Sequence, residues 1–478
     1  MIEPLSGLDA VFLDAETSST PMNVIATILV DGSVEFEAIV ARIESRLPSL
    51  PFMRRRLVEM PFGLDRPAWI EDPDFAVREH VTRVSACAPG DERALEDVVA
   101  RFARGRLDRA RPLWELVVVD GLANDRTAVV IKAHHAALDG VSGTALLLHL
   151  FDRPGEAPGL DDRAGLGERP PSEPSASELF RHGLTRLQEH PRRGLDAAVR
   201  AGRSASRLAR AWLDRDPGLR DAALPFQAAS SPFDGPLSAR RSVAYARVPF
   251  DSVRCIRGAF GGTFNDVVLA ACTRALQAEL RDRGAGTDAP LLAAVPVSTR
   301  GVGDAAASGN RISAFVVQLP VQLEDPIHQL ADVRRGAFRA KRFHAALGDE
   351  ALTSLAEVAT PGVTRWAFET YTRWKLASLH RPLVNLVVSN VPGPPVGLEL
   401  FGRPVESLHP HGPLMEGVGL NITILSYAGS LGIGVLACRE RMSEAHRLAD
   451  GLASAFEELA KLAERAMPHM PPMAWQVA

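Results

Sequence analysis

Two adjacent histidines and an aspartate lie in the segment 134–140, which reads His-His-Ala-Ala-Leu-Asp-Gly. One apolar run precedes this segment, at residues 128–131, and another follows it, at residues 144–150. Histidine is the side chain best suited to accept a proton near neutral pH, so an imidazole at the end of a buried strand is a candidate general base. The dipeptide Asp139-Gly140 is typical of a turn and would fix the loop. The segment therefore predicts acid–base chemistry at a strand end.

The two histidines cannot both serve one site if residues 128–135 form a strand. Successive side chains of a strand point to opposite faces, so one imidazole faces the substrate and the other faces the core. The pair also lacks the i, i+4 spacing of helical zinc ligands, and the sequence contains neither HExxH nor CxxC. We therefore expect no metal site. Taken alone, each histidine is also compatible with a hydrogen-bonded core residue.

The joint pattern H-H-x-x-x-D-G resembles the signature of the CoA-dependent acyltransferase superfamily, which includes chloramphenicol acetyltransferase and peptide-synthetase condensation domains. Other segments resemble one branch, the bacterial wax ester synthase/diacylglycerol acyltransferases, in family order along nearly the whole chain. They are Pro4-Leu5-Ser6 with Asp9, Phe12-Leu13 and Glu16, then Pro21-Met22, Arg111–Glu115, Asn265–Leu269, Pro296–Arg300, Gly309–Arg311, Ser389–Pro394 and Gly419–Thr423. Asn23 departs from the pattern, which has His after Pro-Met. Because Asn23 is far from the histidine motif in sequence, we expect no effect on activity.

The resemblance implies a fold and a reaction. The fold is α/β (α+β): two chloramphenicol-acetyltransferase-like domains, each a mixed sheet flanked by helices, joined by a linker, with the active site in a tunnel between them. The reaction is direct O-acyl transfer of a long-chain fatty acyl group from acyl-CoA to diacylglycerol, to a fatty alcohol, or to both. His135 is the implied general base, and no acyl-enzyme forms. Acyl-CoA is a co-substrate, and no other cofactor and no metal is expected.

The predicted catalytic set is His134, His135, Asp139 and Gly140. The resemblance implies that Asp139 meets an arginine rather than the catalytic imidazole, and we expect Arg300 to be that partner. A buried carboxylate without a partner costs several kcal/mol, which is the physical reason to seek one. Asp139 is therefore expected to be architectural, and the sequence has no G-x-S-x-G elbow to supply a serine nucleophile.

The predicted substrate-binding set is Asn265, Arg300, Asn310, Ser389 and Asn390. Asn265 stands where a helix N-cap is expected, and it is equally open to a role as an amide that orients substrate or donates to an oxyanion. Ser389-Asn390 is also compatible with a turn that ends a strand, and Asn310 with a residue that holds a loop.

Composition limits the class of protein. The chain has 478 residues, 46% of them hydrophobic, and a net charge of -4, which argues against nucleic acid as a partner. Four cysteines without CxxC spacing predict neither a disulfide framework nor a zinc ribbon, and fit a reducing cytoplasm. The N-terminus does not read as a signal peptide, and no apolar run approaches the ~20 residues that span a bilayer. We expect a cytoplasmic protein that meets the inner membrane or lipid inclusions peripherally.

The pattern of apolar residues predicts an N-terminal half at 1–151, a linker region at 152–238 and a C-terminal half at 239–478. Strands are expected at 23–30, 113–119, 127–135, 242–248, 291–296, 312–319, 385–389, 421–426 and 431–437. Helices are expected at 36–47, 95–104, 144–150, 177–214, 266–281, within 327–376 and at 443–466. The helix at 177–214 is rich in arginine, which is compatible with a lipid surface or with docking on the protein itself.

Two other classes of protein remain open. A condensation-type enzyme shares the histidine motif but takes its acyl group from a carrier protein. A catalytically inactive lipid-surface protein would explain the arginine-rich helix without chemistry. The expected partners are acyl-CoA and a lipid alcohol at a membrane or lipid-droplet surface, with the chain as a monomer or homodimer.

Overall fold

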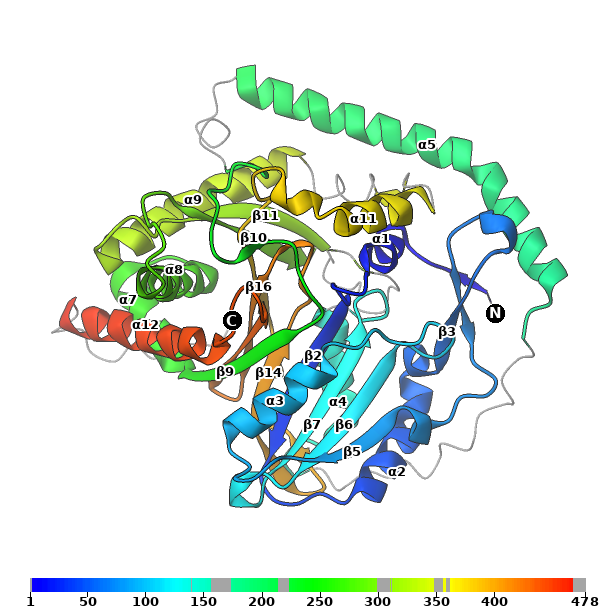
Figure 1. Ribbon diagram of the computed structural model, residues 1–478, viewed down its shortest axis with the longest axis horizontal. Coiled ribbons are helices and arrows are strands. Elements are labelled where there is room, and N and C mark those ends of the chain that lie inside the picture. Colours follow the sequence, from blue (N-terminus) through cyan, green and yellow to red (C-terminus); the bar gives the residue numbers. More distant parts are fainter. Residues whose placement is uncertain are drawn as a thin grey trace.

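The computed structural model describes residues 2–138, 140–155, 173–213, 223–298, 310, 312–347, 356–357 and 362–466. Two six-stranded mixed sheets, each covered by helices, form the two halves of the molecule (Figure 1). The predicted α/β class with two sheet-and-helix halves is confirmed.

The first sheet has the strand order β13-β14-β2-β7-β6-β5. Its strands are β2 (Asn23–Val30), β5 (Val81–Ser85), β6 (Trp114–Asp120), β7 (Thr127–His134), β13 (Glu399–Leu400) and β14 (Arg403–His411). Every residue of β7 is buried, because this central strand has both faces covered. Val129 and Ile131 pack on one face, and Ala128 and Val130 pack on the other. This fully buried strand therefore leads directly into the histidine motif, which begins at its last residue, His134.

The second sheet has the strand order β11-β10-β12-β16-β17-β9. Its strands are β9 (Arg241–Pro249), β10 (Leu291–Ser298), β11 (Ile312–Leu319), β12 (Leu386–Val391), β16 (Leu420–Tyr427) and β17 (Ser430–Cys438). Strands β10, β12 and β16 are parallel neighbours, and the other pairs are antiparallel. Smaller pairings join β1 (Glu3–Pro4), β3 (Arg55–Val58) and β4 (Ala68–Glu71), and β8 (Asp234–Gly235) with β15 (Gly417–Val418).

Helices cover both sheets and extend beyond them. They are α1 (Gly7–Ala15), α2 (Phe36–Arg46), α3 (Glu92–Phe102), α4 (Gly140–Leu150), α5 (Ala176–Leu213), α7 (Phe250–Phe260), α8 (Phe264–Asp282), α9 (Pro326–Leu347), α11 (Val363–Arg373) and α12 (Ala445–Ala466). Helices α2 and α4 pack on one face of the first sheet and α3 on the other. Helices α7, α8, α9 and α12 pack around the second sheet. Among the described residues, no helix combines the length and hydropathy that a bilayer crossing needs.

Strand β14 comes from the second half of the chain but belongs to the first sheet, which the sequence did not reveal. It runs antiparallel to β2, from Val405 opposite Val30 to His411 opposite Ile25. It crosses closely over β17, where a Cβ added at Gly432 would lie 1.7 Å from the Leu408 carbonyl oxygen. Only glycine tolerates so close an approach of two backbones. The predicted boundaries at 151 and 239 stay a prediction, because the sheets do not follow chain order.

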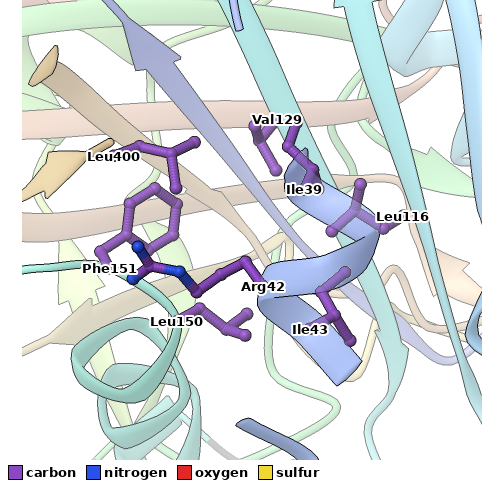
Figure 2. A pocket seen from close by; sticks show the side chains of 8 residues that line it. All are labelled: Ile39, Arg42, Ile43, Leu116, Val129, Leu150, Phe151 and Leu400. Carbon is purple, nitrogen blue, oxygen red and sulfur yellow. The ribbon is translucent and has the colours of Figure 1, made fainter. Parts of the chain in front are cut away.

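A small cavity of about 20 Å³ lies between α2, the first sheet and α4 (Figure 2). Its wall includes the stem of Arg42, whose guanidinium forms two hydrogen bonds to the Asp152 carboxylate at 2.5 and 3.0 Å. Asp152 also exchanges two backbone hydrogen bonds with Glu399, at the start of β13. The cavity has room for about one water molecule and none for an acyl chain. We therefore assign it to packing.

Candidate active site

His135 lies in the turn that directly follows β7. Its backbone N–H donates to the Met22 carbonyl at 2.8 Å, and the His134 N–H donates to the Leu113 carbonyl at 3.0 Å. Strand-end contacts from two neighbouring segments therefore hold the turn. The His135 side chain is half-buried, whereas His134 is only 1% exposed. The two imidazoles thus occupy different environments, as alternation along a strand predicts.

His134 is held as a neutral imidazole. Its Nδ1 accepts a hydrogen bond from the Ala136 N–H at 3.0 Å, which assigns the ring proton to Nε2. Burial lowers the pKa of His134 to about 3, and the nearby charges of Arg109 and His135 add to the effect. A histidine with this pKa is almost entirely unprotonated near neutral pH. The contacts give His134 the task of shaping the turn.

Glu16 faces the protonated nitrogen of His134. Its Oε1 lies 3.7 Å from His134 Nε2, and its Oε2 accepts a hydrogen bond from Arg109 at 3.0 Å. The Glu16 side chain is 1% exposed, so the arginine compensates a buried carboxylate. The guanidinium of Arg109 also donates to the Leu13 carbonyl at 2.5 Å, which ties it to the end of α1.

The ring of Phe12 stacks on the His135 imidazole. The ring centroids are 4.2 Å apart and the planes differ by 12°. Phe12 lies on α1, which begins after the N-cap Ser6 and ends before Glu16. A stacked ring restricts the rotation of the imidazole without changing its charge. Helix α1 therefore contacts His135 directly, and Glu16, which follows the last residue of the helix, faces His134.

Asn310 brings the second half of the chain to the same turn. Its Nδ2 donates to the His135 carbonyl at 2.6 Å and to Asp9 Oδ1 at 2.5 Å, and its backbone N–H also donates to Asp9 Oδ1 at 3.1 Å. Asn310 is 5% exposed and Asp9 is 1% exposed. Both amide hydrogens are engaged within the protein, so these contacts agree with the loop-holding alternative and leave Asn310 no donor for a substrate.

Asn265 does not cap a helix, and this expectation was wrong. The N-cap of α8 is Thr263, whose hydroxyl accepts from the Asp266 N–H while the Asp266 carboxylate accepts from the Thr263 N–H. The spacing Thr-x-x-Asp is the signature of this capping box, and it places Asn265 at the second position of the helix. Its side chain is half-buried and makes no hydrogen bond to any described residue. A role in binding substrate stays a prediction.

Ser389 and Asn390 lie within β12, which continues to Val391. They are half-buried and pair in parallel register with Thr423 and Ile424 of β16. The turn predicted at these residues therefore comes later in the chain. Their function as substrate-binding residues stays a prediction.

Of three further predicted site residues, only Gly140 belongs to the described part of the chain. Asp139 and Arg300 lie outside the described residues, so their pairing stays a prediction. Gly140 begins α4. Asn23, the departure from the family pattern, is distant in sequence but directly opposite His134 in the register of β2 and β7. Its side-chain amide donates to the Gly105 carbonyl at 2.9 Å.

Four residues of the site have no function that could be predicted from the sequence motifs. Asp9, Phe12 and Glu16 all come from the N-terminal motif, and Arg109 precedes the Pro-Leu-Trp segment. The sequence contained a signal that these three residues act together, because Phe12 and Glu16 follow Asp9 by three and seven positions, and residues with this spacing lie on one side of a helix. That side contacts the histidine turn. Within the described part of the chain, no group of three or more His, Cys, Asp or Glu side chains could hold a metal ion.

Comparisons with known proteins agree along most of the chain. Residues 5–268 match the wax ester synthase/diacylglycerol acyltransferase catalytic domain, and residues 308–460 match the C-terminal domain of the same family. A putative diacylglycerol O-acyltransferase of Mycobacterium tuberculosis is 35% identical over 464 residues, which cover 96% of this chain and 90% of that protein. A probable diacylglycerol O-acyltransferase of the same species is 31% identical over 475 residues and 96% of each chain.

Solved structures share the fold. A wax ester synthase/diacylglycerol acyltransferase from Marinobacter aquaeolei superposes with a TM-score of 0.66 at 24% identity, covering 96% of this chain and 99% of that one. Trichothecene 15-O-acetyltransferase from Fusarium sporotrichioides superposes with a TM-score of 0.58 at 12% identity, covering 96% and 94%. The predicted two-domain fold of CoA-dependent acyltransferases is thereby confirmed. The sequence matches over both halves show that this chain belongs to the wax ester synthase/diacylglycerol acyltransferase family.

Proposed function

We propose that this protein is an enzyme that transfers a long-chain fatty acyl group from acyl-CoA to the hydroxyl group of a lipid alcohol. Membership of the family supports acyl transfer, and the names of the relatives point to diacylglycerol as acceptor. Diacylglycerol would give triacylglycerol, and a fatty alcohol would give a wax ester. The observation that carries the proposal is the half-buried imidazole of His135, fixed by Phe12 and by Asn310 at the end of a buried strand.

The reaction proceeds in one transfer. The His135 imidazole takes the proton from the acceptor hydroxyl as its oxygen attacks the thioester carbonyl carbon. The tetrahedral intermediate then collapses, the carbon–sulfur bond breaks, and the leaving CoA sulfur receives the proton from the imidazolium. General-base assistance contributes ~10² to 10⁴ in rate, and alignment of the two substrates contributes much of the rest.

The histidines divide the work. His134 stays neutral and its Nδ1 accepts from the turn backbone, so it shapes the turn. His135, on the other side of the strand end, is left to exchange protons with substrate. Asp139 is assigned to the architecture of the loop, with Arg300 as its partner and Gly140 as the start of the following helix.

The two substrates are proposed to meet in a tunnel between the halves. The amides of Asn265 and Asn390, the hydroxyl of Ser389 and the charge of Arg300 are the proposed contacts to substrate. An amide donor near the thioester would stabilise the negative charge that develops on its oxygen.

The acceptors are apolar, so we place the enzyme at the periphery of a lipid surface, the inner membrane or lipid inclusions. Helix α5 is the candidate that the sequence suggests. It docks on the protein through buried Leu179 and through the ion pair of Arg186 with Asp65 at 3.0 Å, while Phe180 and Leu184 remain more than 40% exposed. Both alternatives for this helix, lipid contact and docking, therefore have some support.

The direct test is an incubation of purified protein with labelled palmitoyl-CoA and either hexadecanol or diolein, followed by separation of neutral lipids. We expect labelled wax ester, labelled triacylglycerol or both, and at most about 1% of that product with His135→Ala. Release of free fatty acid alone, or equal product with His135→Ala, would overturn the proposal. Replacement of palmitoyl-CoA by an acylated carrier protein tests the condensation-type alternative in the same assay.

A further inference from the structure

Large apolar side chains are exposed along α11 and the turn that follows it. Four of them define what we call the α11 face: Val363 (60% exposed), Trp366 (66%), Trp374 (69%) and Leu379 (76%). Isolated exposed apolar residues are common on soluble proteins, whereas four of them within 17 consecutive residues, two of which are tryptophans, indicate an interaction surface.

The α11 face stands on a well-defined backbone. The Tyr371 hydroxyl and His380 Nε2 lie 2.8 Å apart, and Ala377 is buried beneath the turn. The Phe226 N–H donates to the Leu383 carbonyl at 3.1 Å, which ties the end of the segment to another part of the chain. The exposed tryptophans therefore project from a fixed turn and helix and are ready to meet a partner without refolding.

The charge of this segment is opposite to that of the whole chain. Residues 363–381 contain four basic side chains and one acidic side chain, Glu369, on a chain of net charge -4. Three of the four basic residues, Arg373, Lys375 and Arg381, are exposed. Tryptophan beside lysine and arginine is the composition found where proteins meet the headgroup region of a lipid layer. Charge complementarity therefore favours an anionic lipid surface as the partner.

The position of α11 relates this surface to the candidate active site. Helix α11 packs against α1, where the Thr364 hydroxyl donates to the Asp14 carboxylate and Arg365 lies 3.6 Å from the same carboxylate. Helix α1 in turn carries Phe12, which stacks on His135. Figure 1 shows α11 beside α1 in the upper part of the view, with α5 farther out. A lipid layer on the α11 face would lie one helix away from the helix that contacts the catalytic imidazole.

We propose that the α11 face docks the protein on an anionic phospholipid surface, with Trp366 and Trp374 in the headgroup region and the basic side chains against the lipid phosphates. The inference deepens the proposed function, on which it rests for the need to take up an apolar acceptor. It assigns the contact to a helix other than the arginine-rich α5. In this orientation the lipid layer, which supplies the acceptor, lies next to α1 and therefore near the candidate active site.

The test is flotation of the full chain with vesicles of phosphatidylcholine containing phosphatidylglycerol, comparing wild type with the double variant Trp366→Ser/Trp374→Ser. The matched control is Phe62→Ser, which removes an exposed aromatic ring away from the α11 face. Phe62 is 91% exposed, and its ring lies edge-on to that of Phe180 of α5, with the ring centroids 6.2 Å apart. We expect the double variant to partition about tenfold more weakly and the control to bind as wild type. Brominated lipid should quench the tryptophan fluorescence of the wild-type protein, and this quenching should be lost in the double variant.

Two results would overturn the inference. One is equal binding of wild type and the double variant. The other is loss of binding only in Phe62→Ser, which would transfer the contact to α5. Thermal midpoints of the variants should match that of wild type, because the changed side chains are exposed.

The outcome is separable from that of the proposed function. With palmitoyl-CoA and a short alcohol dissolved in buffer, the double variant should keep wild-type turnover, and a loss would mean that the tryptophans act in the site itself. Vesicle binding through the α11 face by a protein that transfers no acyl group to any acceptor would sustain the inference and refute the proposed function.

Discussion

The side-chain amide of Asn310 donates to the main-chain carbonyl of His135 across 2.6 Å and joins positions 175 residues apart in sequence. The turn that carries the proposed base is therefore held from the second half of the molecule as well as from its own sheet. Asp9 completes the arrangement, because its carboxylate accepts from both nitrogens of Asn310.

Replacement of Asn310 should reduce turnover more than it affects substrate binding. In Asn310→Ser the carbonyl of His135 and the carboxylate of Asp9 both lose a buried donor, at a cost of about 1 to 3 kcal/mol in the free energy of unfolding. We expect kcat to fall by about tenfold or more with KM nearly unchanged, because the residue positions the base. Steady-state kinetics would decide, and a rise in KM with normal kcat would show that Asn310 contacts substrate instead.

The two histidines should respond differently to alanine. His135→Ala removes a half-buried base and should lower turnover ~10² to 10⁴-fold with a thermal midpoint close to that of wild type. His134→Ala removes a buried ring that accepts from the turn backbone, so it should lower the midpoint as well. Turnover and thermal unfolding measured on the same samples give the comparison. A highly active His135→Ala protein would be incompatible with general-base catalysis.

Glu16 should act on the turn through His134 and on α1 through Arg109. In Glu16→Gln the amide oxygen still faces His134 Nε2, but Arg109 loses its charged partner; in Glu16→Leu both contacts are lost. We expect stability to decrease in the order wild type, Glu16→Gln, Glu16→Leu, with about 1 to 3 kcal/mol lost in the leucine variant. Urea unfolding measures the order. Equal stability of all three proteins would remove the proposed positioning role.

Two buried histidines on β14 should make the protein less stable in acid. Burial lowers the pKa of His409 to about 4 and that of His411 to about 3, whereas an unfolded histidine titrates near 6.5. Between these values the unfolded chain binds protons that the folded chain does not, so the free energy of unfolding decreases as the pH falls. Each histidine contributes a slope of about 1.4 kcal/mol per pH unit in that window.

The measurement is urea unfolding from pH 7 to pH 4.5 for wild type and His411→Leu, with the exposed His149→Leu as matched control. The slope should be shallower in His411→Leu alone. The pKa of Glu96 is raised to about 7 and that of Asp234 to about 6 by burial, and both have the opposite dependence on pH. All three proteins contain them, so their contribution cancels in the comparison. Identical slopes would mean that His411 is not buried in the neutral form.

Asp152→Asn should destabilise the protein by about 3 kcal/mol, because it leaves the guanidinium of Arg42 buried without its charged partner. The exposed pair of Arg78 with Glu37 offers the control, since Arg78→Gln should leave unfolding unchanged within error. Denaturant unfolding of the two variants tests the contrast. A stable Asp152→Asn protein would indicate that water reaches Arg42 through the neighbouring cavity.

Much of the fold was predictable because most elements have the apolar period of their own type. The strands predicted at 23–30 and 312–319 coincide with β2 and β11, and the hairpin before the histidine motif is present as β6 and β7. Strand β14 was missed, because Arg403–His411 contains two prolines and two histidines and lacks the usual pattern. Its partner strand β2 lies 375 to 386 positions earlier in the chain, and local sequence carries no information on such pairing.

The site was predictable where a single segment carries the chemistry and less so where distant segments meet. The motif identified His135 as the candidate base, but nothing local indicated that Asn310 bonds to its carbonyl. The N-cap of α8 is Thr263 rather than Asn265, and the Thr-x-x-Asp spacing in the sequence was sufficient to predict this capping box. The contribution of Asp9, Phe12 and Glu16 depends on where α1 packs, and that is decided by tertiary contacts.

The exchange of β14 into the first sheet has a consequence for how this protein can be divided. A fragment that stops before residue 399 would leave one side of β2 as an open hydrogen-bonding edge, which invites aggregation. Neither half should therefore yield a well-behaved product when expressed alone, whereas co-expressed fragments can complement each other. Chimaeras between relatives should retain their function best when β2 and β14 are inherited from the same parent.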